Sequence, residues 1–245
     1  MAIIDVRVQI GTTPIWGTPF TEGHLIRMMD KYGIERCIAS STIANTCDFV
    51  RGNAQVKEIA GKGRIYGCVV VNTQYPSLSI EDMRRYLPMD VFAALLIRSG
   101  APGRAVTLDE CSDILNSHRR FGKPVLIETS DREGVLAADE IARTFTGIKF
   151  VLLSMGGGAW RTAVAAAEKT LNLVLEVSGS LSPDKVKLAA EAVGAHRMVY
   201  GSNLPLADPA VTIGLVEDAQ ISDSDKNAIF EGSAKRLFGW ARSTE

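Results

Sequence analysis

The sequence predicts an α/β protein whose eight parallel strands close into a (β/α)8, or TIM, barrel. Eight short runs rich in Val, Ile and Leu alternate with amphipathic segments of helical periodicity. A length of 245 residues with 46% hydrophobic content suits one such barrel. An open doubly wound sheet is the structural alternative, but no Gly-x-Gly-x-x-Gly follows the first strand. We therefore expect a single barrel domain over residues 1–245.

The predicted strands and helices follow one another at regular intervals. We expect strands at 3–11, 35–40, 65–71, 91–97, 123–129, 148–153, 171–177 and 197–201. We expect helices at about 21–32, 48–61, 80–87, 107–121, 130–145, 158–170 and 182–194, and two more after the last strand, ending near 240. Thr107 with Glu110, and Ser130 with Glu133, have the spacing of capping boxes that begin helices. Pro183 suits the first position of a helix.

The first strand separates polar from apolar residues more sharply than any other. Because strand side chains alternate, its residues divide between Ile4, Val6, Val8 and Ile10 on one face and Asp5, Arg7 and Gln9 on the other. A half-exposed edge strand has the same pattern. In a barrel, however, the polar face turns toward the central cavity, so we expect these side chains to line a pocket.

Composition excludes several classes of partner and location. The formal net charge of −1 favours neither nucleic acid nor an anionic membrane as a partner. No apolar run approaches the roughly 18 residues that span a bilayer, and the N-terminus lacks a signal-peptide pattern. The four cysteines form no Cys-x-x-Cys pair, which suits a reduced cytoplasm. We expect a cytoplasmic protein and leave open whether it is a homo-oligomer.

Polar residues gather where the predicted strands end, which is where TIM barrels carry their active sites. The candidates in chain order are Arg7, Gln9, Arg98, Glu128, Ser154, Glu176, Ser202 and Asn203. Glu176 belongs to this set if its side chain points inward. A purely structural barrel needs no such residues, so we expect them to converge on one site.

Several stretches resemble the amidohydrolase-related branch of the amidohydrolase superfamily. They are IIDVRVQIG, MMDKYGIERCIAS, KPVLIETS, FVLLSMGGG, LVLEVSGS, HRMVYGSNLPLADP and IFEGSAKRLFGW. The resemblance covers essentially the whole chain and keeps the order of the motifs. It implies a TIM barrel and the chemistry of metal-dependent hydrolases and decarboxylases.

The metal ligands that the resemblance implies are replaced in this sequence. The His-x-His pair of the first strand becomes Arg7 and Gln9, and the next two histidines become Glu128 and Ser154. The aspartate of the Gly-Ser-Asp motif becomes Asn203. Strand four, where some members carry a lysine or histidine, offers Leu96 and Arg98.

These replacements lead us to expect no metal and no other cofactor. Catalytic zinc usually has about three imidazole or carboxylate ligands, and none of the three histidines lies at a strand end. Arg7 would also place a permanent cation where the metal belongs. A hard-ion site built from oxygens of Gln9, Glu128 and Asn203 is the alternative.

Two functional classes follow from this site. The first is a hydrolase or lyase without the usual metal ligands, acting on a small acidic or carbonyl-containing molecule. In it Arg7 pairs with Glu128, which transfers protons, and Asn203 completes the catalytic set. The predicted substrate-binding residues are Gln9, Arg98, Ser154, Glu176 and Ser202, with Arg98 receiving a substrate carboxylate. The second class is a non-catalytic ligand-binding or assembly protein that keeps the barrel.

Overall fold

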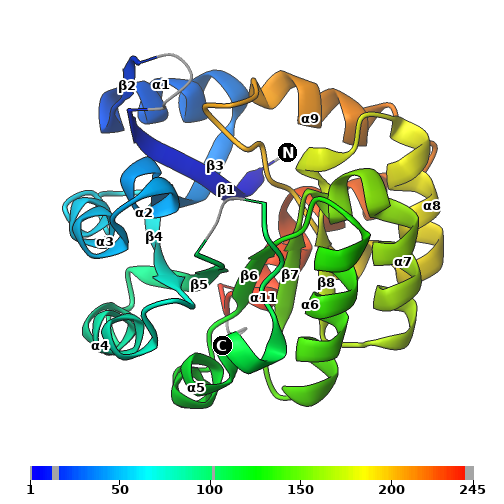
Figure 1. Ribbon diagram of the computed structural model, residues 1–245. Helices are drawn as coiled ribbons and strands as arrows, with labels where there is room; N and C mark the ends of the chain where they lie inside the picture. Colours follow the sequence, from blue (N-terminus) through cyan, green and yellow to red (C-terminus); the bar gives the residue numbers. More distant parts are fainter. Residues whose placement is uncertain (1, 13–16, 101–102, 241–245) are drawn as a thin grey trace, which may run out of the picture.

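The computed structural model describes residues 2–12, 17–100 and 103–240 and shows a barrel of parallel strands surrounded by helices (Figure 1). The barrel strands are β1 (Ile3–Thr12), β3 (Ile34–Ser41), β4 (Ile65–Asn72), β5 (Phe92–Arg98), β6 (Val125–Glu128), β7 (Phe150–Leu153), β8 (Leu173–Glu176) and β9 (Met198–Val199). They pair in chain order, all parallel. The short β2 (Pro19–Phe20) adds antiparallel to β1. The predicted α/β barrel is confirmed.

Backbone hydrogen bonds beyond the short β9 close the barrel onto β1. Val6 N donates to Tyr200 O at 3.0 Å, and Gln9 N donates to Leu204 O at 2.7 Å. Val8 and Leu204 form a parallel bridge. The segment after β9 therefore takes the place of a longer eighth strand and brings residues 200–204 beside the end of β1.

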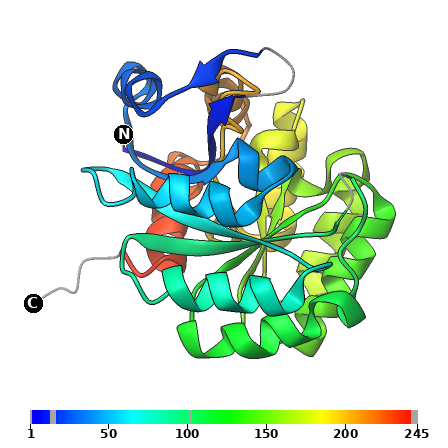
Figure 2. The ribbon, with the colours of Figure 1, turned by 60° about the vertical axis from the view of Figure 1, so that its left-hand side comes forward.

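Helices cover the outer face of the strands (Figure 2). The α-helices of the described residues are α1 (Glu22–Tyr32), α2 (Thr42–Thr46), α3 (Phe49–Lys57), α4 (Pro76–Tyr86), α5 (Leu108–His118), α6 (Arg132–Thr144), α7 (Trp160–Lys169), α8 (Pro183–Val193), α9 (Pro209–Glu217), α10 (Asp223–Asn227) and α11 (Ser233–Leu237). The short α2 between β3 and α3 was not predicted. Within the described residues, no helix combines the length and the apolar composition needed to cross a bilayer.

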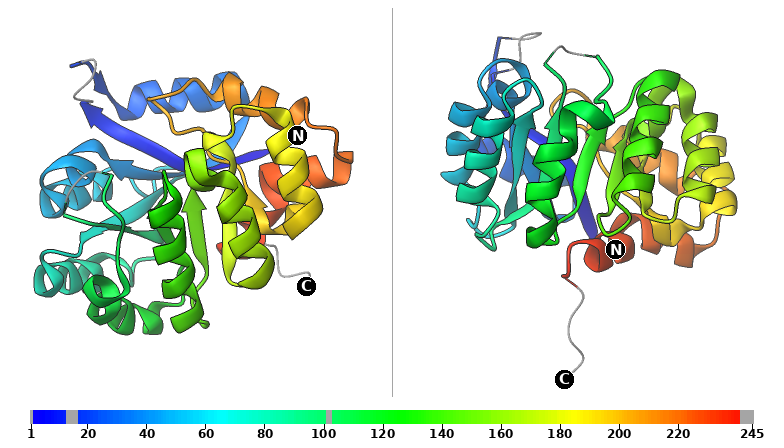
Figure 3. Two further views of the ribbon diagram at one scale, coloured as in Figure 1. Left: turned by 45° about the vertical axis from the view of Figure 1, so that its right-hand side comes forward. Right: turned by 60° about the horizontal axis from the view of Figure 1, so that its bottom comes forward.

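The barrel separates two apolar clusters. The larger one lies between the strands and the helices, where for example Leu95, Ile127 and Leu152 are buried. The smaller one fills the barrel interior and includes Leu96 and Leu126, the neighbours of two of these residues in sequence. Figure 3 shows α11 at the end of the barrel where the chain begins, and Ala234 of this helix is part of the interior cluster. The C-terminal helix therefore closes the amino end of the barrel.

Strand β1 departs from the regular alternation that the sequence suggests. Val6 packs in the interior cluster, whereas Val8 and Ile10 pack in the outer cluster. The pairing of β1 with β3 is irregular between Asp5 and Val8. A β-bulge of this kind places two successive residues on the same side of a strand. The prediction that all four apolar residues share one face is therefore wrong, and the bulge turns Arg7 inward directly after Val6.

Of the two capping boxes predicted from the sequence, the structure contains one. The box of Thr107 and Glu110 begins α5 as predicted. The predicted box of Ser130 and Glu133 is wrong, because Asp131 is the N-cap of α6 and its Oδ1 accepts from Gly134 N at 2.8 Å. The positive end of the helix dipole also stabilises a carboxylate at this position.

The buried Asn53 side chain of α3 forms hydrogen bonds with the backbone of β4, and we expect its loss to destabilise the fold. Its Nδ2 donates to Val70 O at 2.8 Å and to Asp82 Oδ2 at 2.6 Å, and its Oδ1 accepts from Val70 N at 2.8 Å. Asn53→Ala leaves these buried groups unpaired and should lower the free energy of unfolding by about 2–4 kcal/mol. Denaturant titration measures this loss.

The matched control is the exposed Asn227, at the end of α10. Asn227→Ala should change the free energy of unfolding by less than about 0.5 kcal/mol. Equal effects of the two substitutions would contradict the importance of the Asn53 contacts.

Candidate functional site

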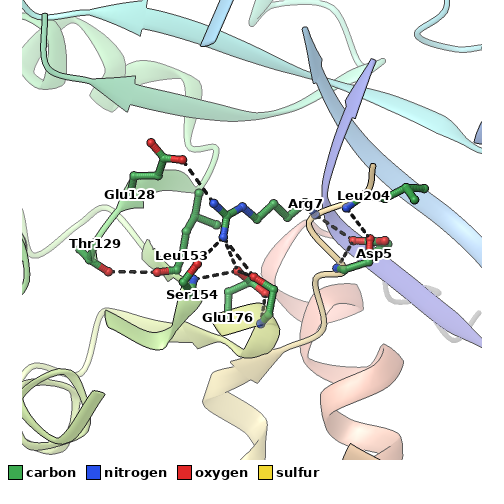
Figure 4. Close-up of polar contacts among 10 residues, drawn as sticks. Asp5, Arg7, Glu128, Thr129, Leu153, Ser154, Glu176 and Leu204 are labelled. Carbon is green, nitrogen blue, oxygen red and sulfur yellow. Dashed lines mark hydrogen bonds and ion pairs between the residues drawn. The ribbon is translucent and has the colours of Figure 1, made fainter. Parts of the chain in front are cut away.

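Arg7 lies at the centre of a polar network at the carboxyl ends of the strands (Figure 4). Its Nη1 donates to Ser154 Oγ at 2.5 Å and to Ser178 Oγ at 3.0 Å. The same nitrogen lies 3.4 Å from Glu176 Oε2, while Nη2 lies 3.3 Å from Glu128 Oε1. The side chain is 11% exposed. The guanidinium is thus held by groups from β6, β8 and the segments that follow β7 and β8.

Glu176 provides the buried counter-charge of this network. It ends β8 with a side chain that is 0% exposed, so its carboxylate does point inward. Its oxygens accept from Ser154 N at 2.9 Å, Ser178 N at 2.5 Å and Ser178 Oγ at 2.8 Å. A Cβ on Gly201 would lie 2.5 Å from Glu176 Oε1, so only glycine leaves room for the carboxylate there. A buried carboxylate with a cation and several donors avoids much of its desolvation cost.

Glu128 is the exposed carboxylate of the network and joins two arginines. It ends β6, and its side chain is 41% exposed. Its Oε1 faces Arg7, and its Oε2 lies 2.7 Å from Arg98 Nη1 at the end of β5. The expected ion pair of Arg7 with Glu128 is confirmed, but it uses one carboxylate oxygen rather than two. Arg98, which we predicted to receive a substrate carboxylate, binds the second oxygen of Glu128 in this structure.

A cavity of about 210 Å³ opens beside Glu128. Its wall includes Arg7, Arg98, Arg104, Glu128, Thr129, Asp131, Gly134 and Ser154, together with the apolar Ile97 and Val106. Small-molecule pockets usually measure about 300–1,000 Å³, so this one suits a ligand with few atoms. Arg104 pairs with Glu110 outside the wall, while Arg7 and Arg98 share the single carboxylate of Glu128, and this pair of arginines favours a ligand with an anionic group.

The other sequence candidates have different positions. Gln9 lies with Arg7 and Glu128 around a smaller hollow inside the barrel. Ser202 is buried, and its hydroxyl accepts from Leu204 N at 3.0 Å. Asn203 has a left-handed backbone with φ of 61°, and its N donates to Arg7 O at 3.0 Å. Neither Ser202 nor Asn203 lines the cavity near Glu128; both instead join the backbone after β9 to β1.

Two site residues were not selected from the sequence. Ser178 follows β8 and contacts both Arg7 and Glu176, and the polar motif VSGS was the available signal. Asp5 was noted on the polar face of β1 but given no role. Its Oδ1 accepts from Arg7 N and from Ser202 N, both at 3.0 Å. Asp5 therefore holds the bulge of β1 against the segment after β9.

The Asp5 carboxyl is buried and only partly satisfied. Its Oδ2 has no hydrogen-bond partner among the described residues. Burial raises the pKa of Asp5 from 3.8 to about 7, and the nearby Glu176 adds to this rise, while hydrogen bonds from Ser202 and Arg7 oppose it. Two carboxylates that share a buried region favour a proton on one of them.

Fold and site together define a TIM-barrel protein with a charged polar site at the carboxyl ends of its strands. The chain belongs to the amidohydrolase family, whose sequence pattern matches residues 23–240. The family expected from the sequence motifs is therefore confirmed. No curated protein matches the chain significantly.

Solved structures with the same fold cover nearly the whole chain. A 2,6-dihydroxybenzoate decarboxylase from Rhizobium has a TM-score of 0.75 at 14% identity, covering 98% of this chain and 99% of its own. A dihydroxybenzoic acid decarboxylase from Polaromonas sp. JS666, with bound manganese and the inhibitor 2-nitroresorcinol, has a TM-score of 0.78 at 16% identity over 99% and 98%. An uncharacterised TIM-barrel protein from Bordetella bronchiseptica reaches 0.80 at 16% identity over 98% and 99%. At identities this low, the structural similarity establishes the shared fold alone.

The expectation that no cofactor is used is contradicted by these comparisons. The Polaromonas enzyme and a 5-carboxyvanillate decarboxylase from Novosphingobium aromaticivorans, both of this fold, contain manganese. Within residues 2–12, 17–100 and 103–240, no three His, Cys, Asp or Glu side chains are grouped so that they could hold a metal ion. The residues around Arg7 therefore do not fit a conventional three-ligand site.

The buried carboxyl of Asp5 predicts a specific pH dependence of stability. Because its pKa is about 7 in the folded protein and 3.8 ordinarily, the folded protein retains a proton that the unfolded chain releases between these pH values. This contribution to stability is complete below pH 4 and is lost as the pH rises to about 7. The stability of Asp5→Asn relative to the wild type should therefore rise by about 2–4 kcal/mol between pH 4 and pH 7 and stay level above.

Denaturant titrations of both proteins at a series of pH values measure this difference, and other titrating groups cancel in it. A difference that does not change with pH would show that Asp5 ionises normally in the folded protein.

Proposed function

We propose that this protein binds a small carboxylate, of the size of a single-ring benzoate, in the cavity beside Glu128. The observation that carries the proposal is the contact of Arg98 with the half-exposed carboxylate of Glu128 at 2.7 Å, at the edge of a 210 Å³ cavity. The named activities of the dihydroxybenzoate decarboxylases of the same fold support this class of ligand.

Glu128 occupies the position on Arg98 that a ligand carboxylate would take. A guanidinium binds carboxylates through two parallel hydrogen bonds, so Arg98 can exchange one carboxylate for another with little change in geometry. The pair is partly open to solvent, which keeps the cost of this exchange low. Arg7 has additional support from Glu176 and two serines, and it stays in place during the exchange.

The proposed reaction is a lyase or hydrolase step in which Glu128 accepts a proton as general base and returns it to the product as general acid. Glu128 and Arg98 line the same cavity. When a ligand carboxylate binds Arg98, the released Glu128 carboxylate can turn toward the ligand. General acid–base catalysis requires such a group within hydrogen-bond reach of the reacting atom. Arg7, still facing Glu128, would stabilise negative charge that develops on the ligand.

Two substitutions should change the affinity for 2,6-dihydroxybenzoate in opposite directions. Arg98→Ala removes the cation that receives the ligand and should weaken binding about tenfold to a hundredfold. Glu128→Gln removes the competing charge while keeping the shape, and it should tighten binding. Isothermal titration calorimetry measures both affinities, and Arg85→Ala, an exposed arginine paired with Glu81 on α4, is the matched control.

The same titrations are repeated with added manganese and with a chelator, because relatives of this fold bind that metal. Weaker binding to Glu128→Gln than to the wild type would contradict the exchange. Product analysis then tests the reaction: turnover that is lost in Glu128→Gln while binding persists supports the proton-transfer role, and binding without turnover in the wild type assigns a binding protein.

A further inference from the structure

Two adjoining cavities lie at the amino end of the barrel, at the opposite ends of the strands from Glu128. One measures about 420 Å³ and the other about 570 Å³. They share Lys149 and Leu171, which precede β7 and β8, and we call the combined surface the amino-end groove. The wall residues that matter here are the cations Arg143, Lys169, Arg197 and Arg236 and the apolar Val174 and Leu237. Helix α11 forms one side, at the end of the barrel seen in Figure 3.

The wall of the amino-end groove contains basic residues and no Asp or Glu. Arg143 is neutralised by Asp139, which lies 2.8 Å away on α6. Among the described residues, no carboxylate lies within ion-pair distance of Lys149, Lys169 or Arg236. In a protein with a net charge of −1, this concentration of positive charge favours an anionic ligand.

Arg197 gives the groove a cation with a fixed position. Its Nε donates to Val193 O at 3.1 Å and its Nη1 donates to Ala167 O at 2.6 Å. Partial burial lowers the pKa of Arg197, but a guanidinium remains charged at neutral pH. Because these two carbonyls already hold the side chain, little further conformational entropy is lost when a ligand binds beside it.

The groove also has an apolar part. Leu171 is 71% exposed and belongs to the wall of both cavities. Val174 and Leu237 lie beside it in the smaller cavity. An exposed leucine surrounded by cations suits a ligand that carries both a charged group and an apolar body.

We propose that the amino-end groove is a second ligand site, which binds a small organic phosphate with an apolar body. Both volumes fall within the range of small-molecule pockets, about 300–1,000 Å³. A phosphate monoester carries nearly two charges and three acceptor oxygens at neutral pH, so it can use cations from several elements at once. Lys149, Arg197 and Arg236 supply such cations from the starts of β7 and β9 and from α11. This inference does not depend on the function proposed for the cavity beside Glu128.

Calorimetric titration with phenyl phosphate tests the proposal. All proteins carry Arg98→Ala, so that binding in the cavity beside Glu128 is weakened equally in each of them. Lys149→Gln and Arg236→Gln should each weaken phenyl phosphate about tenfold, as expected for the loss of one charge-assisted contact. Lys187→Gln, which changes an exposed lysine on α8, is the matched control and should leave the affinity unchanged.

The apolar part is tested with Leu171→Asn. This substitution should weaken phenyl phosphate but leave the affinity for inorganic phosphate unchanged. Lys149, Leu171 and Arg236 are exposed, and every protein compared carries the same Arg98→Ala substitution, so circular dichroism should show no difference in folding among them. Loss of saturable phenyl phosphate binding in Arg98→Ala alone would overturn the proposal, as would equal weakening by Lys187→Gln. Equal affinities for phenyl phosphate and inorganic phosphate would overturn the apolar part.

Discussion

The buried contact between Arg7 and Glu176 is the constraint on which the rest of the site depends. A carboxylate with no exposure is unstable inside a barrel unless a cation and hydrogen-bond donors surround it. The donors are the backbone amides of Ser154 and Ser178 and the hydroxyl of Ser178. The glycine at position 201 leaves the space that a Cβ would fill. Segments after three different strands are thus fitted to one ion pair.

The network has a buried layer and an exposed layer with different physical roles. Glu176 neutralises Arg7 below the cavity, where water has little access. Glu128 and Arg98 form the upper layer, which is open to solvent and therefore weakly held. The buried layer fixes the position of the Arg7 guanidinium, whereas the ion pair of the exposed layer can open when a ligand binds. Such a division lets a permanent charge be placed accurately without making every contact around it rigid.

The sequence predicted the barrel and much of the site because both depend on local patterns. Strand positions follow from apolar runs, and their carboxyl ends locate Arg7, Arg98 and Glu128. The bulge in β1 could not be predicted, since it arises from pairing with β3 rather than from the residues themselves. The backbone roles of Ser202 and Asn203 depend in the same way on barrel closure. The cofactor expectation failed because it rested on the identities of the replaced ligands and on the charge of Arg7, whereas structures of the same fold carry manganese.

The bulge makes the site sensitive to the length of β1 as well as to its composition. A strand with strict alternation cannot place both Val6 and the next residue on its inner side. Deleting a single residue before position 7 would move Arg7 into the place of Val6 in the interior cluster and put the aliphatic Val8 where the guanidinium meets Glu176. Alignments that place a gap within residues 5–8 would therefore exchange the inner and outer residues of this strand, even when every other strand is matched correctly.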